Sequence, residues 1–135
     1  MPAQAIPPSG PHHSFWRSFH IALAGALHVL RTERNAQIEG LIGLVAVGLG
    51  LALGLTRTEW AIVCILIVLV LGLEMVNTAV EAAVDLACPA PHPLAKKAKD
   101  SAAGAVVLAA LGSVIVGLII FLPRVWWLLS GWFWR

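Results

Sequence analysis

Residues 60–88 have the sequence WAIVCILIVLVLGLEMVNTAVEAAVDLAC, in which an apolar first half leads into a second half with acidic side chains. An uncharged run such as residues 61–73 is typical of a transmembrane helix, which needs about 20 apolar residues to cross the bilayer core. A single helix of about 28 residues is longer than this, so its acidic end is expected to reach the membrane interface. This stretch therefore predicts a helical membrane protein.

The composition of the whole chain agrees with this prediction. Of its 135 residues, 59% are hydrophobic and 12% are charged, so a soluble domain of this length would have to hide too much apolar surface. Nine Lys and Arg residues against seven Asp and Glu residues give a net charge of +2, and no basic run is interleaved with aromatic residues. This positive charge is too sparse for a nucleic-acid-binding surface, which excludes nucleic acid as a partner.

Further apolar segments lie on both sides of the opening stretch. The predicted membrane spans are residues 37–56, 60–87 and 101–122. The polar segment HPLAKKAKD, residues 92–100, is expected to be the loop between the second and third spans. Residues 14–30 have aromatic and small apolar side chains at helical spacing, which predicts an amphipathic helix on the membrane surface.

The two ends of the chain differ from this membrane domain of residues 14–123. Residues 1–13 are rich in proline and lack an apolar signal-peptide core, so they are expected to form a disordered tail. Residues 124–135 contain four of the six Trp residues, which predicts an interfacial aromatic anchor. The predicted fold is all-α: an integral membrane protein with an N-terminal amphipathic surface helix plus three transmembrane helices.

The distribution of Lys and Arg predicts how the chain is oriented in the membrane. Six of these residues precede the first span or lie between the second and third: Arg17, Arg31, Arg34, Lys96, Lys97 and Lys99. Three lie on the opposite side: Arg57, Arg124 and Arg135. Positive charge accumulates on the cytoplasmic side of membrane proteins, so we expect a cytoplasmic N-terminus and an external C-terminus.

Polar residues follow one another along the second predicted span at steps of three or four. They are Glu74, Asn77, Thr78, Glu81 and Asp85. At about 100° per residue they share one face of the helix. Ionisable groups at membrane depth are costly and normally line a cavity, form pairs or bind an ion, so this stripe predicts a functional site. The alternative is a polar seam that only joins helices by hydrogen bonds.

The acidic residues are suited to phosphate chemistry. Glu33 and Glu81 come from different predicted helices near one interface, and Mg²⁺ prefers oxygen ligands that it shares with substrate phosphates. Lys99 and Asp100 open the third span, where free backbone N–H groups and the helix dipole favour an anion. A metal site that faces a phosphate site would suit phosphoryl transfer.

Two motifs resemble a known family. EMVNTAVEAAVD (residues 74–85) and HPLAKKAKDSAAGAV (residues 92–106) are similar to the small prokaryotic diacylglycerol kinases and undecaprenol kinases. The resemblance runs from about residue 15 to residue 123, and TERN (residues 32–35) is closer to the undecaprenol kinase branch. It implies a lipid kinase that uses ATP and Mg²⁺, built as a homotrimer of three-span subunits in the bacterial inner membrane.

The resemblance also implies roles for single residues. Glu74 would be the general base on the lipid hydroxyl, and Glu33 and Glu81 would hold the metal and, through it, the nucleotide. Asn77 and Asp85 would support the site, although Asn77 could serve only as an amide that packs helices together.

By the same resemblance, His92, Lys99 and Asp100 would contact the nucleotide. Glu39 has two readings from its position alone: a residue that orients the lipid substrate, or an interfacial carboxylate that faces the headgroups.

Two other functions remain open at this point. One is a diacylglycerol-specific kinase that makes phosphatidic acid, because undecaprenol and diacylglycerol both present a primary hydroxyl at the interface. The other is a small subunit of an ion-coupled or proton-coupled transporter that uses the acidic stripe as a relay. A relay should place ionisable residues across the full membrane depth, whereas here they gather toward one face, which favours the enzyme.

Overall fold

The computed structural model describes residues 15–133, and all four elements in this range are helices. They are α1 (Phe15–Thr32), α2 (Arg34–Leu53), α3 (Arg57–Ala87) and α4 (Pro93–Phe133). The last three are long and apolar enough to cross a membrane. The predicted all-α fold with three candidate spans is confirmed, and the protein is a membrane protein. The tail predicted over residues 1–13 lies outside the described residues.

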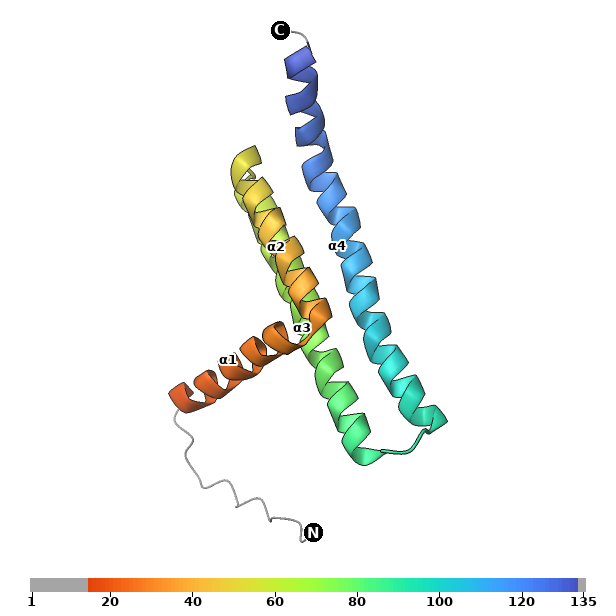
Figure 1. Ribbon diagram of the computed structural model, residues 1–135. Coiled ribbons are helices and arrows are strands. Elements are labelled where there is room, and N and C mark those ends of the chain that lie inside the picture. Colours follow the sequence, from red (N-terminus) through yellow and green to blue (C-terminus); the bar gives the residue numbers. More distant parts are fainter. Residues whose placement is uncertain (1–14, 134–135) are drawn as a thin grey trace.

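Helix α2 runs alongside α3, whereas α1 leaves the bundle at a wide angle (Figure 1). None of the α1 side chains is buried against the rest of the chain. Glu33 alone separates α1 from α2, with extended backbone angles of φ −91° and ψ 119°. The Gln37 side-chain amide donates to the Arg31 carbonyl at 2.8 Å, and the Thr32 hydroxyl donates to the His28 carbonyl at 2.9 Å. These bonds hold the chain on both sides of the joint.

Helices α2 and α3 pack through buried residues spaced seven apart. On α2 these are Ala36, Gly43 and Gly50, and on α3 they are Val63, Val70 and Asn77. A seven-residue spacing is typical of helices that pack at a small angle. A Cβ atom added to Gly50 would lie 2.9 Å from the Trp60 ring, and one added to Gly43 would lie 3.3 Å from Ile67. The glycines therefore let the two helices approach closely.

Helices α2 and α3 begin before the first residues of the corresponding predicted spans, 37–56 and 60–87. Helix α2 begins at Arg34 and ends at Leu53, where Gly54 adopts the left-handed conformation with φ 64°. Glycine takes this conformation without a steric cost, which makes it suited to end a helix. Helix α3 then begins at once, because Thr56 and Glu59 form a capping box. The limits of the bilayer along these helices stay a prediction.

The loop predicted over residues 92–100 is wrong, because α4 is already helical from Pro93. Proline is favoured in the first turn of a helix, and the His92 ring Nδ1 accepts a hydrogen bond from the Leu94 N–H at 3.2 Å. Helix α4 also continues through Pro123 as far as Phe133. Helix α4 therefore extends beyond both ends of the predicted span over residues 101–122.

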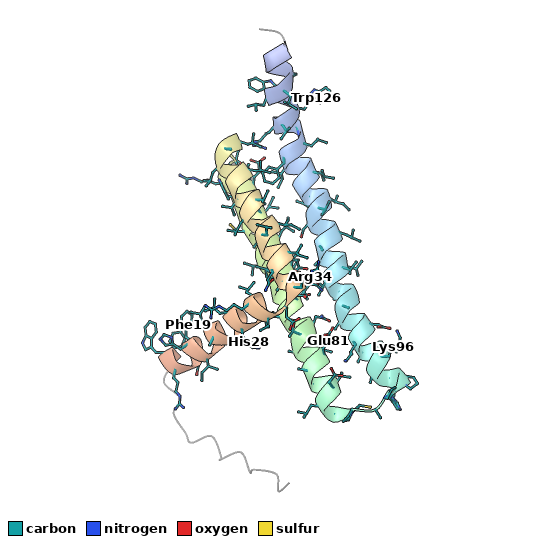
Figure 2. The ribbon with its side chains drawn as sticks, in the orientation of Figure 1. Phe19, His28, Arg34, Glu81, Lys96 and Trp126 are labelled. Carbon is teal, nitrogen blue, oxygen red and sulfur yellow. The ribbon has the colours of Figure 1, made fainter. Side chains whose placement is uncertain are left out.

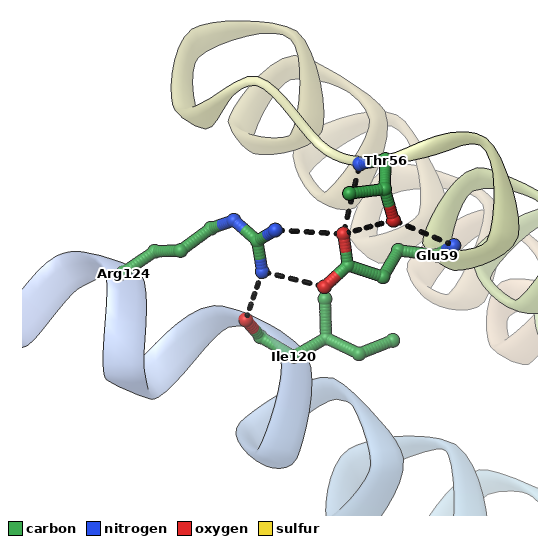
Figure 3. A network of polar contacts seen from close by, with 4 residues as sticks. All are labelled: Thr56, Glu59, Ile120 and Arg124. Carbon is green, nitrogen blue, oxygen red and sulfur yellow. Dashed lines mark hydrogen bonds and ion pairs between the residues drawn. The ribbon is translucent and has the colours of Figure 1, made fainter.

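An ion pair joins α3 to α4 at the end of the bundle that holds the α2–α3 turn. The Arg124 guanidinium donates to both carboxylate oxygens of Glu59, each at 2.7 Å, and also to the Ile120 carbonyl at 3.1 Å (Figure 3). The Thr56 N–H and hydroxyl donate to Glu59 Oε2 at 2.8 and 2.6 Å. A bidentate pair of this kind fixes direction as well as distance. It lies beside the buried side chains of Leu55 and Ile120.

We expect replacement of Arg124 by alanine to lower the melting temperature of the protein in detergent by several degrees. The substitution leaves the Glu59 carboxylate without its ion-pair partner. It also removes the bond that ties the C-terminal part of α4 to α3. The matched control is Arg57→Ala, since Arg57 is an exposed arginine at the same end of the bundle. Equal melting temperatures for the two variants would show that the pair does not hold the helices together.

Candidate active site

The acidic residues of α2 and α3 lie on facing helix surfaces. The contacts Gly50–Trp60 and Gly43–Ile67 show that each step along α2 is matched by a step in the opposite direction along α3. The same register brings Ala36, which is 1% exposed, opposite Glu74. We call five polar residues from the joint before α2, the start of α2 and the second half of α3 the acidic cluster: Glu33, Glu39, Glu74, Asn77 and Glu81.

Glu74 is at the centre of the acidic cluster and is only 3% exposed. The carboxylates of Glu33 and Glu81 lie near the Glu74 carboxylate. Glu39 also lies near Glu74. The structure thus brings these predicted acidic residues near one another toward one end of the bundle.

Two polar atoms of the acidic cluster are buried and lack a hydrogen-bond partner within the described part of the chain. They are Glu39 Oε2 and Asn77 Oδ1. The other polar atom of the Asn77 amide, Nδ2, donates to Glu81 Oε1 at 3.1 Å, so its oxygen is free to accept. Buried acceptors in folded proteins are normally satisfied, which makes these atoms candidates for a contact with a bound molecule or ion.

An apolar groove begins beside the acidic cluster. Its volume is about 350 Å³, and it is lined mainly by aliphatic and small side chains of α2, α3 and α4. Glu39 is the charged residue in its lining, and Val70 and Leu71 lie one turn before Glu74 on α3. The groove thus places a hydrocarbon-lined space next to a group of carboxylates.

A second group of predicted site residues surrounds the α3–α4 turn. Lys99 Nζ lies 2.5 Å from Asp85 Oδ1, which joins the two helices, and Lys96 forms an ion pair with Asp100 on α4. These four residues and His92 line an open pocket of about 670 Å³. Figure 2 places Glu81 on α3 and Lys96 on α4 toward the same end of the bundle, and Trp126 at the opposite end. The pocket is therefore on the same side as the acidic cluster.

Comparison with known proteins identifies the family. Residues 20–121 match the family described as prokaryotic diacylglycerol kinase. This chain belongs to that family. The predicted recognition is thus confirmed, and with it the enzyme class, a lipid kinase.

Two curated relatives of this prokaryotic diacylglycerol kinase family member are similar over most of the chain. It is 44% identical to the undecaprenol kinase of Bacillus subtilis, over 82% of this chain and 89% of the relative. It is 42% identical to a diacylglycerol kinase of Synechocystis, over 78% of this chain and 61% of the relative. The similarity to an undecaprenol kinase agrees with the branch that the TERN motif indicated.

The donor set of this family member suits a hard cation. Glu33 offers carboxylate oxygens from the joint before α2 and Glu81 offers them from α3, and Asn77 Oδ1 is a buried acceptor without a partner next to Glu81. The described residues contain no group of three or more His, Cys, Asp or Glu that could hold a metal by themselves. Mg²⁺ does not need such a group, because it is commonly held by one or two carboxylates together with substrate phosphates and water.

Sequence reasoning missed the Glu59–Arg124 pair of this kinase. The spacing of Thr56 and Glu59 is a capping-box signal that could have placed the start of α3. No sequence signal connects Glu59 to Arg124, because the two residues are 65 positions apart.

Proposed function

We propose that this protein transfers the γ-phosphoryl group of ATP to the primary hydroxyl of a membrane lipid alcohol, undecaprenol or diacylglycerol. The observation that carries this proposal is the buried Glu74 within the acidic cluster, next to the apolar groove. A lipid alcohol has the matching chemistry, a long hydrocarbon chain that ends in one hydroxyl. The 44% identity to an undecaprenol kinase favours undecaprenol as the acceptor.

The proposed reaction has one proton to move. The lipid hydroxyl oxygen forms a bond to the γ-phosphorus while the bond from this phosphorus to the bridging oxygen of ADP breaks. Glu74 would accept the hydroxyl proton, because its side chain is shielded from water and lies next to the groove that would take the lipid chain. Glu39 lies at the polar end of the groove and would orient the hydroxyl toward Glu74.

Glu33 and Glu81 would hold Mg²⁺, with the Asn77 amide supporting Glu81 through its hydrogen bond. When bound, the metal ion would offset the negative charge of the ATP phosphates. This role fits the charge of the site, because carboxylates alone would repel a nucleotide.

The pocket at the α3–α4 turn would take the nucleotide, with contacts from His92, Lys99 and Asp100. Lys99 supplies positive charge there, and Asp85 holds Lys99 in position through their ion pair. In the complete enzyme we propose a homotrimer in the bacterial inner membrane, with the acidic cluster and this pocket at the cytoplasmic face, where ATP is available. The aromatic residues after Arg124, such as Trp126 at 73% exposure, would then lie at the external interface.

The direct test uses purified protein in micelles with labelled ATP and Mg²⁺, and offers undecaprenol and diacylglycerol separately. The control lipids have the same chains and an esterified or phosphorylated terminal oxygen, so they cannot accept a phosphoryl group. We expect label to enter the free alcohols only, and undecaprenol at the higher kcat/KM. Absence of label in both alcohols would overturn the proposed function, and faster transfer to diacylglycerol would reverse the proposed preference.

The proposed orientation gives a separate prediction. In a variant with Cys64 and Cys88 replaced by serine, a cysteine at Lys97 should react with a membrane-impermeant reagent only after the cells are opened. A cysteine at Thr58, in the exposed first turn of α3, should react in intact spheroplasts. The opposite labelling pattern would place the nucleotide pocket outside the cytoplasm, away from ATP.

A further inference from the structure

The pocket at the α3–α4 turn separates two neighbouring lysines that look alike in the sequence. Lys96 lines this pocket together with Lys99 and Asp100, whereas Lys97 is not among the lining residues. At about 100° per residue, the three lining residues fall within a sector of about 100° around α4, and Lys97 points roughly 160° away from Lys99. Lys96 and Lys97 contribute equally to the cytoplasmic positive charge, so the pocket gives Lys96 a position that membrane orientation does not require.

The charges of the pocket balance only with Lys96. Asp85 and Asp100 bring two negative charges to the lining, and Lys99 brings one positive charge. With these three alone the pocket would be net negative and would repel the phosphates of a nucleotide. Lys96 supplies the second positive charge, and the start of α4 beside it adds the positive end of the helix dipole.

Lys96 is held at the pocket by an ion pair that leaves it accessible. Its ammonium group pairs with Asp100 one turn further along α4, and the two side chains are 77% and 61% exposed. Exposed ion pairs are weak, so a phosphate can compete for this group, and an ammonium has three N–H donors, so it can keep Asp100 as a partner at the same time. Lysine near the start of a helix opposes the helix dipole, so helix stability does not explain Lys96.

We propose that Lys96 is a second phosphate-binding residue of the nucleotide pocket, which contacts the phosphate chain of ATP beside Lys99. The assignment rests on the proposed lipid kinase function. An ammonium group acts on phosphate oxygens as a compact positive charge and does not recognise the base or the sugar. Loss of Lys96 should therefore weaken the binding of nucleotides with several phosphates and leave the binding of adenosine unchanged.

The experiment compares Lys96→Met with Lys97→Met in the full-length protein in micelles with Mg²⁺. Both substitutions remove one positive charge from adjacent exposed residues of α4, so they lower the overall field of this end of the bundle equally. We expect Kd for ATP and ADP to rise about 5-fold in Lys96→Met at low salt, as for a lost contact between exposed charges, and to stay at the wild-type value in Lys97→Met. Competition with a fluorescent ATP analogue gives Kd for ATP, ADP and adenosine.

Two further measurements test the nature of the contact. Lys96→Arg keeps the charge and should recover most of the affinity for ATP. Added salt should reduce the difference between Lys96→Met and the wild type, because it screens exposed charges. Equal losses in both methionine variants, wild-type Kd for ATP in Lys96→Met, or an equal loss of adenosine binding would each overturn the assignment and leave the kinase function intact. A wild-type protein that neither binds ATP nor phosphorylates a lipid would instead overturn the proposed function, and the role of Lys96 with it.

Discussion

Replacement of Glu74 by glutamine is expected to lower kcat for lipid phosphorylation by about 10² to 10⁴, the range typical of a lost general base. Glutamine has nearly the same size as glutamate and is also polar, so the packing of α2 against α3 should persist. Because Glu74 is not one of the two proposed metal ligands, binding of ATP and Mg²⁺ should remain. The measurements are the turnover rate at saturating lipid and the affinity for a fluorescent ATP analogue.

Glu59→Gln is the matched control for this substitution. Glu59 is the acidic residue outside the two groups around the candidate site, and it pairs with Arg124 at the opposite end of the bundle. This variant should lose thermal stability and keep its turnover rate at temperatures where it is folded. If Glu74→Gln lost ATP affinity and turned over normally at saturation, Glu74 would belong to the nucleotide site and the base would have to be sought elsewhere.

The second large effect is expected from Glu33→Gln and Glu81→Gln, each of which should lower turnover by about 10² or more at ordinary Mg²⁺ concentrations. Each substitution removes a charged oxygen ligand from a site that has only two carboxylates. Raising the Mg²⁺ concentration should restore part of the rate, because the remaining ligand still binds the ion weakly.

A titration of turnover against Mg²⁺ checks this prediction, with circular dichroism to show that both variants are folded. Glu74→Gln is the informative comparison, since a lost base should not be restored by more metal. Wild-type turnover in either variant at low Mg²⁺ would contradict the assignment of that residue as a ligand.

The candidate site could be predicted from the sequence because much of it lies on one helix. Glu74, Asn77 and Glu81 follow one another at steps of three and four, and that spacing alone places them on one face of α3. Glu33 was predicted from its place near the same interface as Glu81 and from the family resemblance, and Glu39 from its place at the membrane interface. How these two residues face Glu74 depends on the register between α2 and α3, which depends on close packing at Gly43 and Gly50.

The missed parts of the fold have two physical causes. The start of α4 was placed too late, because the charged residues from Lys96 to Asp100 suggested a loop, whereas Pro93 and the His92 ring begin a helix there. The end of α4 was placed too early, because proline usually ends a helix. Beyond Pro123, the Arg124 side chain donates to the Ile120 carbonyl and ties α4 to Glu59, a long-range contact without a local signal.

The joint at Glu33 gives the enzyme a mechanical property. One non-helical residue connects α1, whose amphipathic pattern predicts a place on the membrane surface, to α2, which is a candidate membrane span. If each helix keeps to its own layer of the bilayer, the angle between them depends on the shape of the membrane, and Glu33 lies where that angle is set. We therefore expect a change in membrane curvature or thickness that tilts one helix against the other to move the Glu33 carboxylate relative to Glu81 on α3. The bonds from the Glu33 N–H to the Val29 carbonyl and from the Gln37 side chain to the Arg31 carbonyl would resist this movement.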